Sequence, residues 1–469
     1  MSSPELRYAW KVCSVTSLGL VLIGVNASTL NVALPAVVRH FRPSPLGASW
    51  ILLSFLLVST ASLVFFGRVA DLLGRREVYL TGFAIFTGAS VLAGLAPNVG
   101  VLIALRSVQA IGAAMILANG TVIITDAFPP DRLSQGMGVY IGTLSVAQLA
   151  GPTLGGLIAE TLGWRWIFWI NVPAGIVALV WGALVLRRTP RGAREPVDAP
   201  GNLLVFLALS ALLFGLSNGS WAALAAFAVL VPLVIVAERR ASHPVLNVAL
   251  FRDRMLAFAN LAAFCAALAR ASLILLAGLY FQAARGVDAF TAGLAVLPVP
   301  VGMALASPIA GSLRSVRPMA LSVGGALLSA AGLAFLLAGT GGPYWVTAAG
   351  LFLAGCGNGA FLTGNTTQVM RALPSGGLGV INGFRLMTMN TGIVLSVSIS
   401  LTVLTSAVSP EVRGQIYAGT LSRVSPVALD ELISGFQRAY AVLLGVALLG
   451  AFFAAMASTP AMSRSMPKA

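Results

Sequence analysis

Apolar runs of about twenty residues, the length an α-helix needs to cross the ~30 Å hydrocarbon core of a bilayer, recur along the whole of this 469-residue chain. Only 9% of the residues are charged and the mean hydropathy is +0.92, so the chain lacks the polar surface that would cover a soluble core of this size. We therefore predict an all-α integral membrane protein. A very apolar soluble helical bundle is the weaker alternative, and an outer-membrane barrel would instead show alternating segments of about ten residues.

The order of these runs predicts about fourteen transmembrane helices. We place them near residues 10–35, 49–67, 78–96, 99–125, 135–160, 164–187, 201–217, 221–237, 255–282, 289–313, 318–339, 343–370, 378–407 and 436–458.

Arginine and lysine side chains set the expected orientation of these helices. With the N-terminus inside, nineteen of the 29 basic residues fall in inside segments and six in outside loops, and the rest lie at or within helices. Basic residues accumulate on the cytoplasmic side of membrane proteins, so we expect both termini to be cytoplasmic. The net charge of +15 is therefore a topology signal, and nucleic acid is not an expected partner.

An internal echo divides the chain into two halves. Residues 112–129 align without a gap with 357–374, and 134–142 align with 375–383. This register pairs the fourth and fifth predicted helices with the twelfth and thirteenth, as in transporters built from parallel repeats. We expect three parts: an N-terminal six-helix bundle over 1–187, a cytoplasmic linker with two accessory helices over 188–254, and a C-terminal six-helix bundle over 255–469.

One predicted cytoplasmic loop is unusually charged for this chain. Residues 67–76 read GRVADLLGRR and lie between two long apolar runs. Glycine permits close approach and sharp turns, and an aspartate can accept hydrogen bonds from a neighbouring helix N-terminus. We expect a gate that holds the two halves together, formed by Gly67, Asp71, Gly74, Arg75 and Asp126. The simpler alternative is that these charges only fix orientation.

The same loop resembles the signature loop of the major facilitator superfamily. RSVQAIGAA at 106–114 resembles the helix-4 motif of this superfamily, and GPTLGG at 151–156 resembles the helix-5 motif typical of its antiporters. WRWIFWINVP at 164–173 and NVALP at 31–35 resemble segments of its fourteen-helix drug:proton antiporter branch. The resemblance implies two six-helix bundles plus two accessory helices, alternating access, and proton-driven export of small molecules. Carried over by position, Asp71 and Arg75 are gate residues, Arg106 and Gln109 belong to a helix-4 coupling motif, and Gly151, Pro152, Gly155 and Gly156 shape helix 5 where the halves meet.

The chain departs from this branch in its first helix. Relatives usually carry an aspartate five residues before the Asn31 of NVALP, and the chain has Asn26 there. An amide cannot carry a proton in the neutral range. All fourteen acidic residues map to loops or helix ends, so Asp126, Glu160 or the substrate itself would have to carry any coupled proton.

Basic residues do occur within the predicted helices. Arg270 lies halfway along one, where an unpaired arginine usually faces a bundle interior or a water-filled cavity. A cavity with positive charge and no acid suits an anionic or zwitterionic substrate. The alternative for such an arginine is that helix carbonyls and asparagine side chains satisfy it. The candidate substrate-binding residues are Asn26, Arg270, Tyr280, Gln282 and Arg385.

These features together predict a secondary active exporter of small amphipathic molecules in a bacterial inner membrane, acting as a monomer. Rivals of the same fold are a uniporter, an importer or a lipid translocase without proton coupling, and a non-transporting receptor is a further alternative. The chain has two histidines, three cysteines in helices, and no nucleotide-binding GxxxxGK[ST] sequence. We therefore expect no enzyme activity, no metal site and no cofactor.

Overall fold

The computed structural model describes residues 3–43, 45–188, 199–240, 253–287, 289–372, 378–406 and 426–457. All regular secondary structure in these ranges is α-helical, which confirms the predicted fold class. The helices are α1 (Ser3–Phe41), α2 (Pro45–Leu73), α3 (Arg75–Gly94), α4 (Val99–Ala127), α5 (Leu133–Thr161), α6 (Trp166–Trp169), α7 (Asn171–Val185), α8 (Ala199–Asn218), α9 (Trp221–Arg240), α10 (Arg254–Arg285), α11 (Ala289–Val296), α12 (Pro298–Ser312), α13 (Pro318–Gly339), α14 (Tyr344–Ala372), α15 (Leu378–Ser406) and α17 (Pro426–Met456).

Two of the expected helices are each broken into two pieces. The run 164–187 forms α6 and α7, and the run 289–313 forms α11 and α12. The second break falls just before Pro298, which has no backbone N–H to donate and therefore begins a helix more readily than it continues one. Ten helices in the described ranges are long and apolar enough to cross a membrane.

The helices form two groups that meet along two seams. In the first group, α1 packs on α5 and α4 packs on α2 and α3, and in the second, α14 packs on α12 and α13 while α10 packs on α15 and α17. The groups meet where α2 contacts α15 and where α5 contacts α12, and the α8–α9 pair packs beside α2 and α15. Backbone contact defines the first seam: a Cβ on Gly67 would lie 2.2 Å from the carbonyl oxygen of Gly379.

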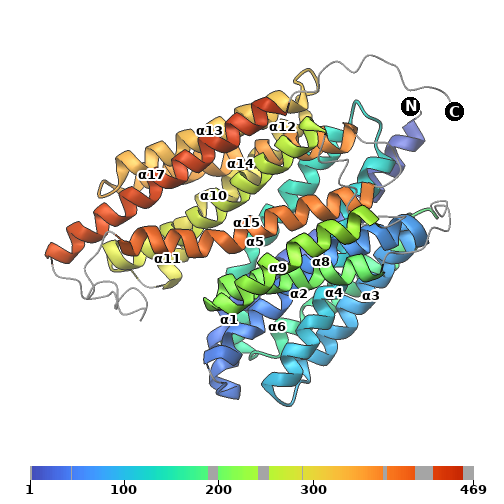
Figure 1. Cartoon of the computed structure of the whole chain (residues 1–469), viewed down its shortest axis with the longest axis horizontal. Coiled ribbons are helices and arrows are strands. Elements are labelled where there is room, and N and C mark those ends of the chain that lie inside the picture. Colours follow the sequence, from blue (N-terminus) through green and yellow to red (C-terminus); the bar gives the residue numbers. More distant parts are fainter. Residues whose placement is uncertain are drawn as a thin grey trace.

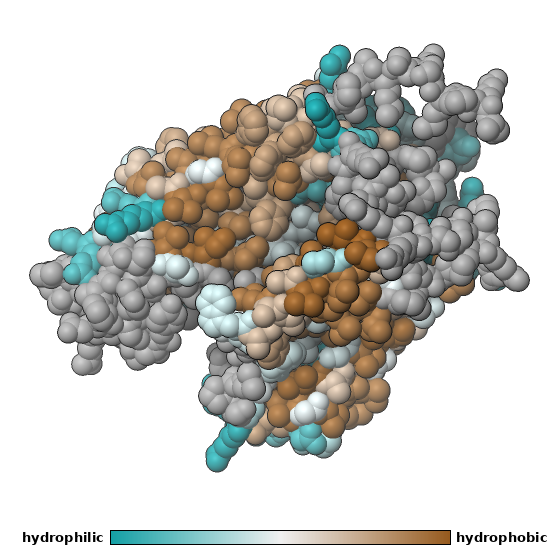
Figure 2. Space-filling model, viewed as in Figure 1, coloured by the Kyte–Doolittle hydropathy of each residue, from teal (hydrophilic) through white to brown (hydrophobic). Residues whose placement is uncertain are grey.

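The groups converge towards the end of the molecule where α1 begins and α17 ends, which we call the termini end, and diverge towards the opposite end, which we call the far end (Figure 1). Two hydrogen bonds join α15 to the first group in the termini-end half of the helices. Asn382 donates to the carbonyl of Ala118 at 2.8 Å, and Asn390 donates to Thr60 at 3.0 Å. On the face that Figure 2 shows, the coloured surface of both groups is largely apolar, and hydrophilic residues gather towards the two ends.

Candidate functional site

The charged loop forms a compact ion-pair cluster at the termini end. Gly74 joins α2 to α3 with φ +107°, a conformation that residues with a Cβ rarely adopt. Arg75 begins α3, donates to Asp71 at 3.1 Å and also pairs with Asp126 at the end of α4. Arg75 is only 8% exposed, and a charge so buried needs such partners.

One member of this cluster reaches across to the second group. The Oδ2 atom of Asp71 accepts a hydrogen bond from the backbone N–H of Gly379 at 3.2 Å, next to the first residue of α15. The free N–H groups of a helix N-terminus favour an anion at this position. The pair between Arg75 and Asp126, by contrast, joins α3 to α4 inside the first group. Within the cluster, the link between the groups is therefore Asp71, which Arg75 holds in place.

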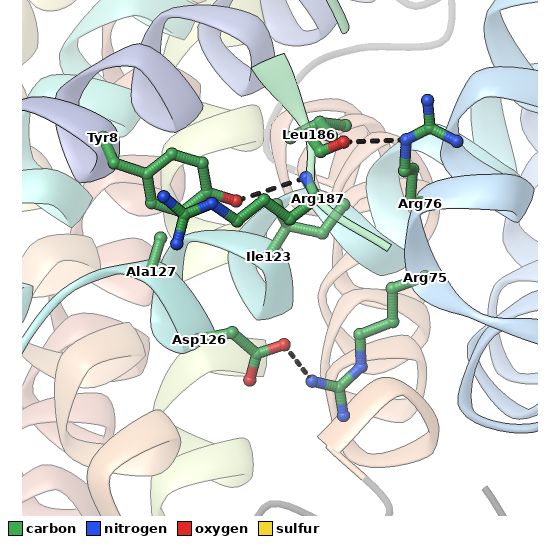
Figure 3. Close-up of a pocket in the computed structure, with 8 residues that line it drawn as sticks. All are labelled: Tyr8, Arg75, Arg76, Ile123, Asp126, Ala127, Leu186 and Arg187. Atoms are coloured by element: carbon green, nitrogen blue, oxygen red, sulfur yellow. Dashed lines mark hydrogen bonds and ion pairs between the residues drawn. The ribbon is translucent and has the colours of Figure 1, made fainter. Parts of the chain in front are cut away.

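The cluster is also tied to α1 and α7. Arg75 and Asp126 point towards each other at the edge of a cavity of about 130 Å³, which Tyr8, Arg76 and Arg187 help to line (Figure 3). Arg76 donates to the carbonyl of Leu186 at 2.7 Å, just beyond the end of α7. The guanidinium of Arg187 lies over the Tyr8 ring at 4.1 Å. These contacts fix the loop to the rest of the first group.

A second polar cluster lies inside the first group, around Asn26 of α1. Its Oδ1 atom accepts hydrogen bonds from Arg106 at 3.5 Å, Gln109 at 3.2 Å and Asn171 at 3.3 Å. Arg106 also donates to Oε1 of Gln109 at 2.5 Å, and Gln109 donates to Ser90 at 2.7 Å. Asn26 is 1% exposed and Arg106 is 2% exposed, so the cluster is enclosed.

Every partner of Arg106 in this cluster is neutral. Besides the two amide oxygens, it donates to the carbonyl of Ile51 at 3.3 Å and lies over the Phe55 ring at 4.3 Å. The Nδ2 atom of Asn26 has no partner among the described residues, whereas its oxygen has three donors. Asn26 therefore acts as a hydrogen-bond acceptor. Its neutral amide oxygen leaves the charge of Arg106 in place, whereas a carboxylate at this position would neutralise that charge.

Arg385 of α15 is satisfied in the same way inside the second group. It is 3% exposed, and it donates to Oδ1 of Asn365 at 3.2 Å and to Thr366 at 2.6 Å. Asn365 in turn donates to the carbonyl of Ala259 at 3.0 Å, which ties the pair to α10. Arg385 is thus held by neutral groups of α14.

Arg270 differs from both of these arginines. It lies at the middle of α10 and is half-buried, and it makes no hydrogen bond or ion pair with any residue that the structure describes. Towards the far end its neighbours on one side, Leu273 and Ala277, are at most 2% exposed, whereas on the other side Ile274 is 36% exposed and a Cβ on Gly278 would meet nothing within 4 Å.

The same face of α10 is covered towards the termini end. Residues spaced three or four apart share one face of a helix, and the four residues of this face that precede Arg270 are all at most 8% exposed: Leu256, Asn260, Ala263 and Ala267. Leu256 and Ala263 share an apolar cluster with Tyr140 of α5. We call residues 256, 260, 263, 267, 270, 274 and 278 the α10 stripe. Arg270 lies at the border between the buried side of α10, which continues at Ala277, and an open edge formed by Ile274 and Gly278.

The glycines of the helix-5 motif do not lie where the two groups meet, contrary to our expectation. A Cβ on Gly151 would lie 1.7 Å from Oγ of Ser28, and one on Gly155 would lie 2.6 Å from the carbonyl oxygen of Thr29, so both pack α5 on α1. The contact with the second group is made by Gly138, nearer the termini end, against Ser307. The helix direction explains this, because Gly151 lies in the diverging far-end half. The surroundings of Pro152 and Gly156 lie outside what the structure describes.

Two further candidates lie away from the open part of the stripe. Tyr280 is 1% exposed, accepts a hydrogen bond from the N–H of Gly341 at 2.9 Å and packs on Phe436 of α17. Six residues at 3.6 per turn place it about 120° around α10 from Ile274, on the side that packs on α17. Gln282 donates to the carbonyl of Gly278 in its own helix at 3.3 Å. In this structure Tyr280 therefore packs inside the second group, and a substrate contact by Tyr280 or Gln282 stays a prediction.

The comparisons with known proteins agree with this architecture. The family model of the Major Facilitator Superfamily matches residues 16–397, more than half of the chain. The chain belongs to the Major Facilitator Superfamily. It is a multi-pass membrane transporter of that family and not an enzyme.

Bacterial relatives of this transporter carry resistance names. It is 29% identical over 430 residues to the multidrug resistance protein Stp of Mycobacterium tuberculosis, covering 89% of this chain and 80% of that one. It is 31% identical over 366 residues to the methylenomycin A resistance protein of Streptomyces coelicolor, covering 76% and 77%. These relatives imply a plasma-membrane location.

The fold also matches solved structures of the family. The crystal structure of the human organic anion transporter MFSD10 (TETRAN) superposes with a TM-score of 0.67 at 18% identity, covering 95% of this chain and 99% of that one. At that identity the likeness supports the fold alone.

Proposed function

We propose that the chain exports small amphipathic anions or zwitterions, of the kind typical of antibiotics, by alternating access. The observation that carries this proposal is Arg270, a cation at the middle of a membrane-spanning helix without a partner among the described residues. A charge at that depth is costly unless water or an anion accompanies it. The resistance names of the bacterial relatives support export as the direction.

The orientation completes the proposal. We place both termini in the cytoplasm, as the distribution of arginine requires, so the convergent termini end is the cytoplasmic side. The structure then corresponds to an outward-facing state, in which the open part of the α10 stripe faces the exterior. The bundles would extend over 1–187 and 255–469, with the linker and the α8–α9 pair of 188–254 between them. This extra pair supports assignment to the fourteen-helix drug:proton antiporter branch.

The gate would work through Asp71. In the outward-facing state its carboxylate holds the N-terminus of α15, and Arg75 and Asp126 fix that carboxylate from the first group. Opening towards the cytoplasm requires the bond to Gly379 to break while the pairs inside the first group persist. The backbone contact between Gly67 and Gly379 separates in the same step.

Energy coupling has two candidates. Proton exchange, which the branch implies, needs a group that can titrate on the transport path, such as Asp126 beside the gate or the substrate itself. Transport without proton exchange is the second candidate, and the cluster around Asn26 favours it. There an amide accepts the three hydrogen bonds that the usual aspartate would accept, and an amide holds no exchangeable charge.

Binding of a matched pair of ligands tests the proposal. We expect Arg270→Ala to weaken binding of naphthalene-1-sulfonate by about 10- to 100-fold, because a charge-assisted contact contributes roughly 1.5–3 kcal/mol. Binding of the neutral naphthalene-1-sulfonamide should change little. Arg39→Ala is the control, because Arg39 is an exposed arginine near the end of α1. Equal losses for both ligands, or no loss for either, would overturn the assignment of Arg270.

A further inference from the structure

Three buried or half-buried arginines lie away from the ends of the described helices, Arg106, Arg270 and Arg385, and no described acidic side chain contacts any of them. Arg106 and Arg385 are nearly fully buried, and their partners are amide oxygens, a carbonyl, a hydroxyl and an aromatic ring. Arg270 has no partner among the described residues. The described groups that hold Arg106 and Arg385 do not titrate in the neutral range, and Arg270 is the one of the three whose donors remain for a ligand.

The acidic side chains that the structure describes lie at the ends of the helices. Each is in a loop or within the first or last two turns: Glu5, Asp71, Glu77, Asp126, Asp131, Asp253, Asp430 and Glu431. Of these, Asp71 and Asp126 are already held by Arg75 in the gate. Arg270, at the middle of α10, is far along the helix from the nearest of them on its own element, Asp253.

This arrangement decides which charge crosses the membrane. Over a complete transport cycle the protein returns to its starting state, so the net charge moved equals the charge on whatever is carried. Arg106 and Arg385 are saturated by neutral groups and Arg270 is open to a ligand, so the anion bound at Arg270 is the charge that moves.

We infer that the membrane potential drives export, with the anionic substrate carried alone and no proton exchanged for it. The inference rests on the proposed function, because it needs an anion at Arg270. A membrane potential that is negative inside drives an anion outwards. Export is also the direction that the resistance names of the bacterial relatives support. A potential of about 100 mV corresponds to about 2.3 kcal/mol per charge, or a concentration ratio of about 50 for a singly charged anion.

Transport by the full chain reconstituted in liposomes tests this inference. The probe is naphthalene-1-sulfonate, because a sulfonate keeps its charge through the neutral range and cannot itself carry the proton. A potassium gradient with valinomycin sets the potential, and a pH gradient is imposed separately with the potential held at zero. We expect an inside-positive potential of about 100 mV to concentrate the probe by up to about 50-fold, and the pH gradient to have no effect. Uptake that follows the pH gradient at zero potential and ignores the potential would overturn the inference.

A second assay separates failure of the inference from failure of the proposed function. Exchange of labelled for unlabelled naphthalene-1-sulfonate at zero potential needs binding and alternating access but no driving force. Exchange that is absent, or that persists unchanged in Arg270→Ala, contradicts the proposed function itself. Exchange that depends on Arg270, combined with net uptake that ignores the potential, contradicts only the inference. Arg39→Ala should behave as the unmodified chain in both assays.

Discussion

Arg106 and Arg270 are both arginines within membrane-spanning helices, and the two groups of helices treat them in opposite ways. The first group encloses Arg106 and surrounds it with two amide oxygens, a carbonyl and the Phe55 ring. The second group leaves Arg270 half-buried at the edge of an open face, with no partner among the described residues. Depth in the membrane therefore does not by itself mark a ligand site. An arginine whose N–H groups already have acceptors stabilises its helix group, whereas an arginine whose N–H groups lack acceptors can bind an anionic ligand.

The largest expected difference between the two sites is in stability. Gln109→Leu removes the 2.5 Å acceptor of Arg106 and the link to Ser90, so we expect unfolding to become easier by roughly 2–3 kcal/mol. Arg270→Leu removes a half-buried charge that has no partner to lose, and should leave stability unchanged or raise it. Thermal unfolding of both variants in one detergent measures the contrast. Equal destabilisation by the two changes would mean that Arg270 is as structural as Arg106.

Chemical accessibility should separate the two sites next. Both cysteine substitutions are made in a background that lacks the three native cysteines. Ile274→Cys lies one turn beyond Arg270, and Ser90→Cys lies within the cluster around Asn26. Ile274 is 36% exposed and Ser90 is 0% exposed. We expect a membrane-impermeant thiol reagent added outside to label the first at least about tenfold faster than the second, because only exposed thiols react readily. Slow labelling at both positions would show that the open part of the α10 stripe does not face the exterior.

Placing an acid beside each arginine gives a smaller, more specific contrast. Ile274→Asp sits one helical turn from Arg270 and should compete with an anionic ligand, weakening its binding by about tenfold. Asn26→Asp neutralises Arg106 instead, so anion binding should change by less than about twofold while transport becomes dependent on pH. Binding and flux at several pH values measure both. If Asn26→Asp weakens anion binding as much as Ile274→Asp does, the Arg106 cluster is part of the ligand site.

The smallest expected effect concerns the covered side of Arg270. Asp71→Asn removes the charge that Arg75 and the N-terminus of α15 hold at the gate, which should raise the population of states open at the termini end by a few-fold. Ala263→Cys, on the covered part of the α10 stripe, then becomes the reporter. Its labelling from the cytoplasmic side in inverted vesicles should rise a few-fold in the Asp71→Asn background. An unchanged rate would mean that Asp71 does not hold the gate closed.

The sequence predicted well the features that depend on local pattern. The helices follow from the length of the apolar runs, and Gly74 follows from the turn that only glycine makes easily. Arg75 and Asp126, both named among the expected gate residues, form an ion pair in the structure. The sequence did not predict helix breaks such as the one before Pro298, because the hydropathy of the chain stays high across the break. Each broken helix was therefore predicted as one continuous segment.

The features that the sequence missed depend on which way a helix face points. Ser90 and Asn171 complete the Asn26 cluster from α3 and α7, and no spacing along the chain links them to Arg106. The WINVP segment that holds Asn171 was the only available signal. Tyr280 was expected as a candidate substrate-binding residue, but its side chain packs inside the second group, where it is 1% exposed. Which face looks inwards is set by tertiary packing.

The α2–α15 seam has a consequence for how this transporter can evolve. There Gly67 meets Gly379 through main-chain atoms, and Gly383 meets the carbonyl of Leu63 with equally little space for a side chain. Any added carbon at these positions would wedge the halves apart, so this part of the molecule tolerates almost no variation. The open part of the α10 stripe is under no such constraint. Under the function that we propose, new specificities would therefore arise by substitution around Arg270 while the α2–α15 seam is inherited unchanged.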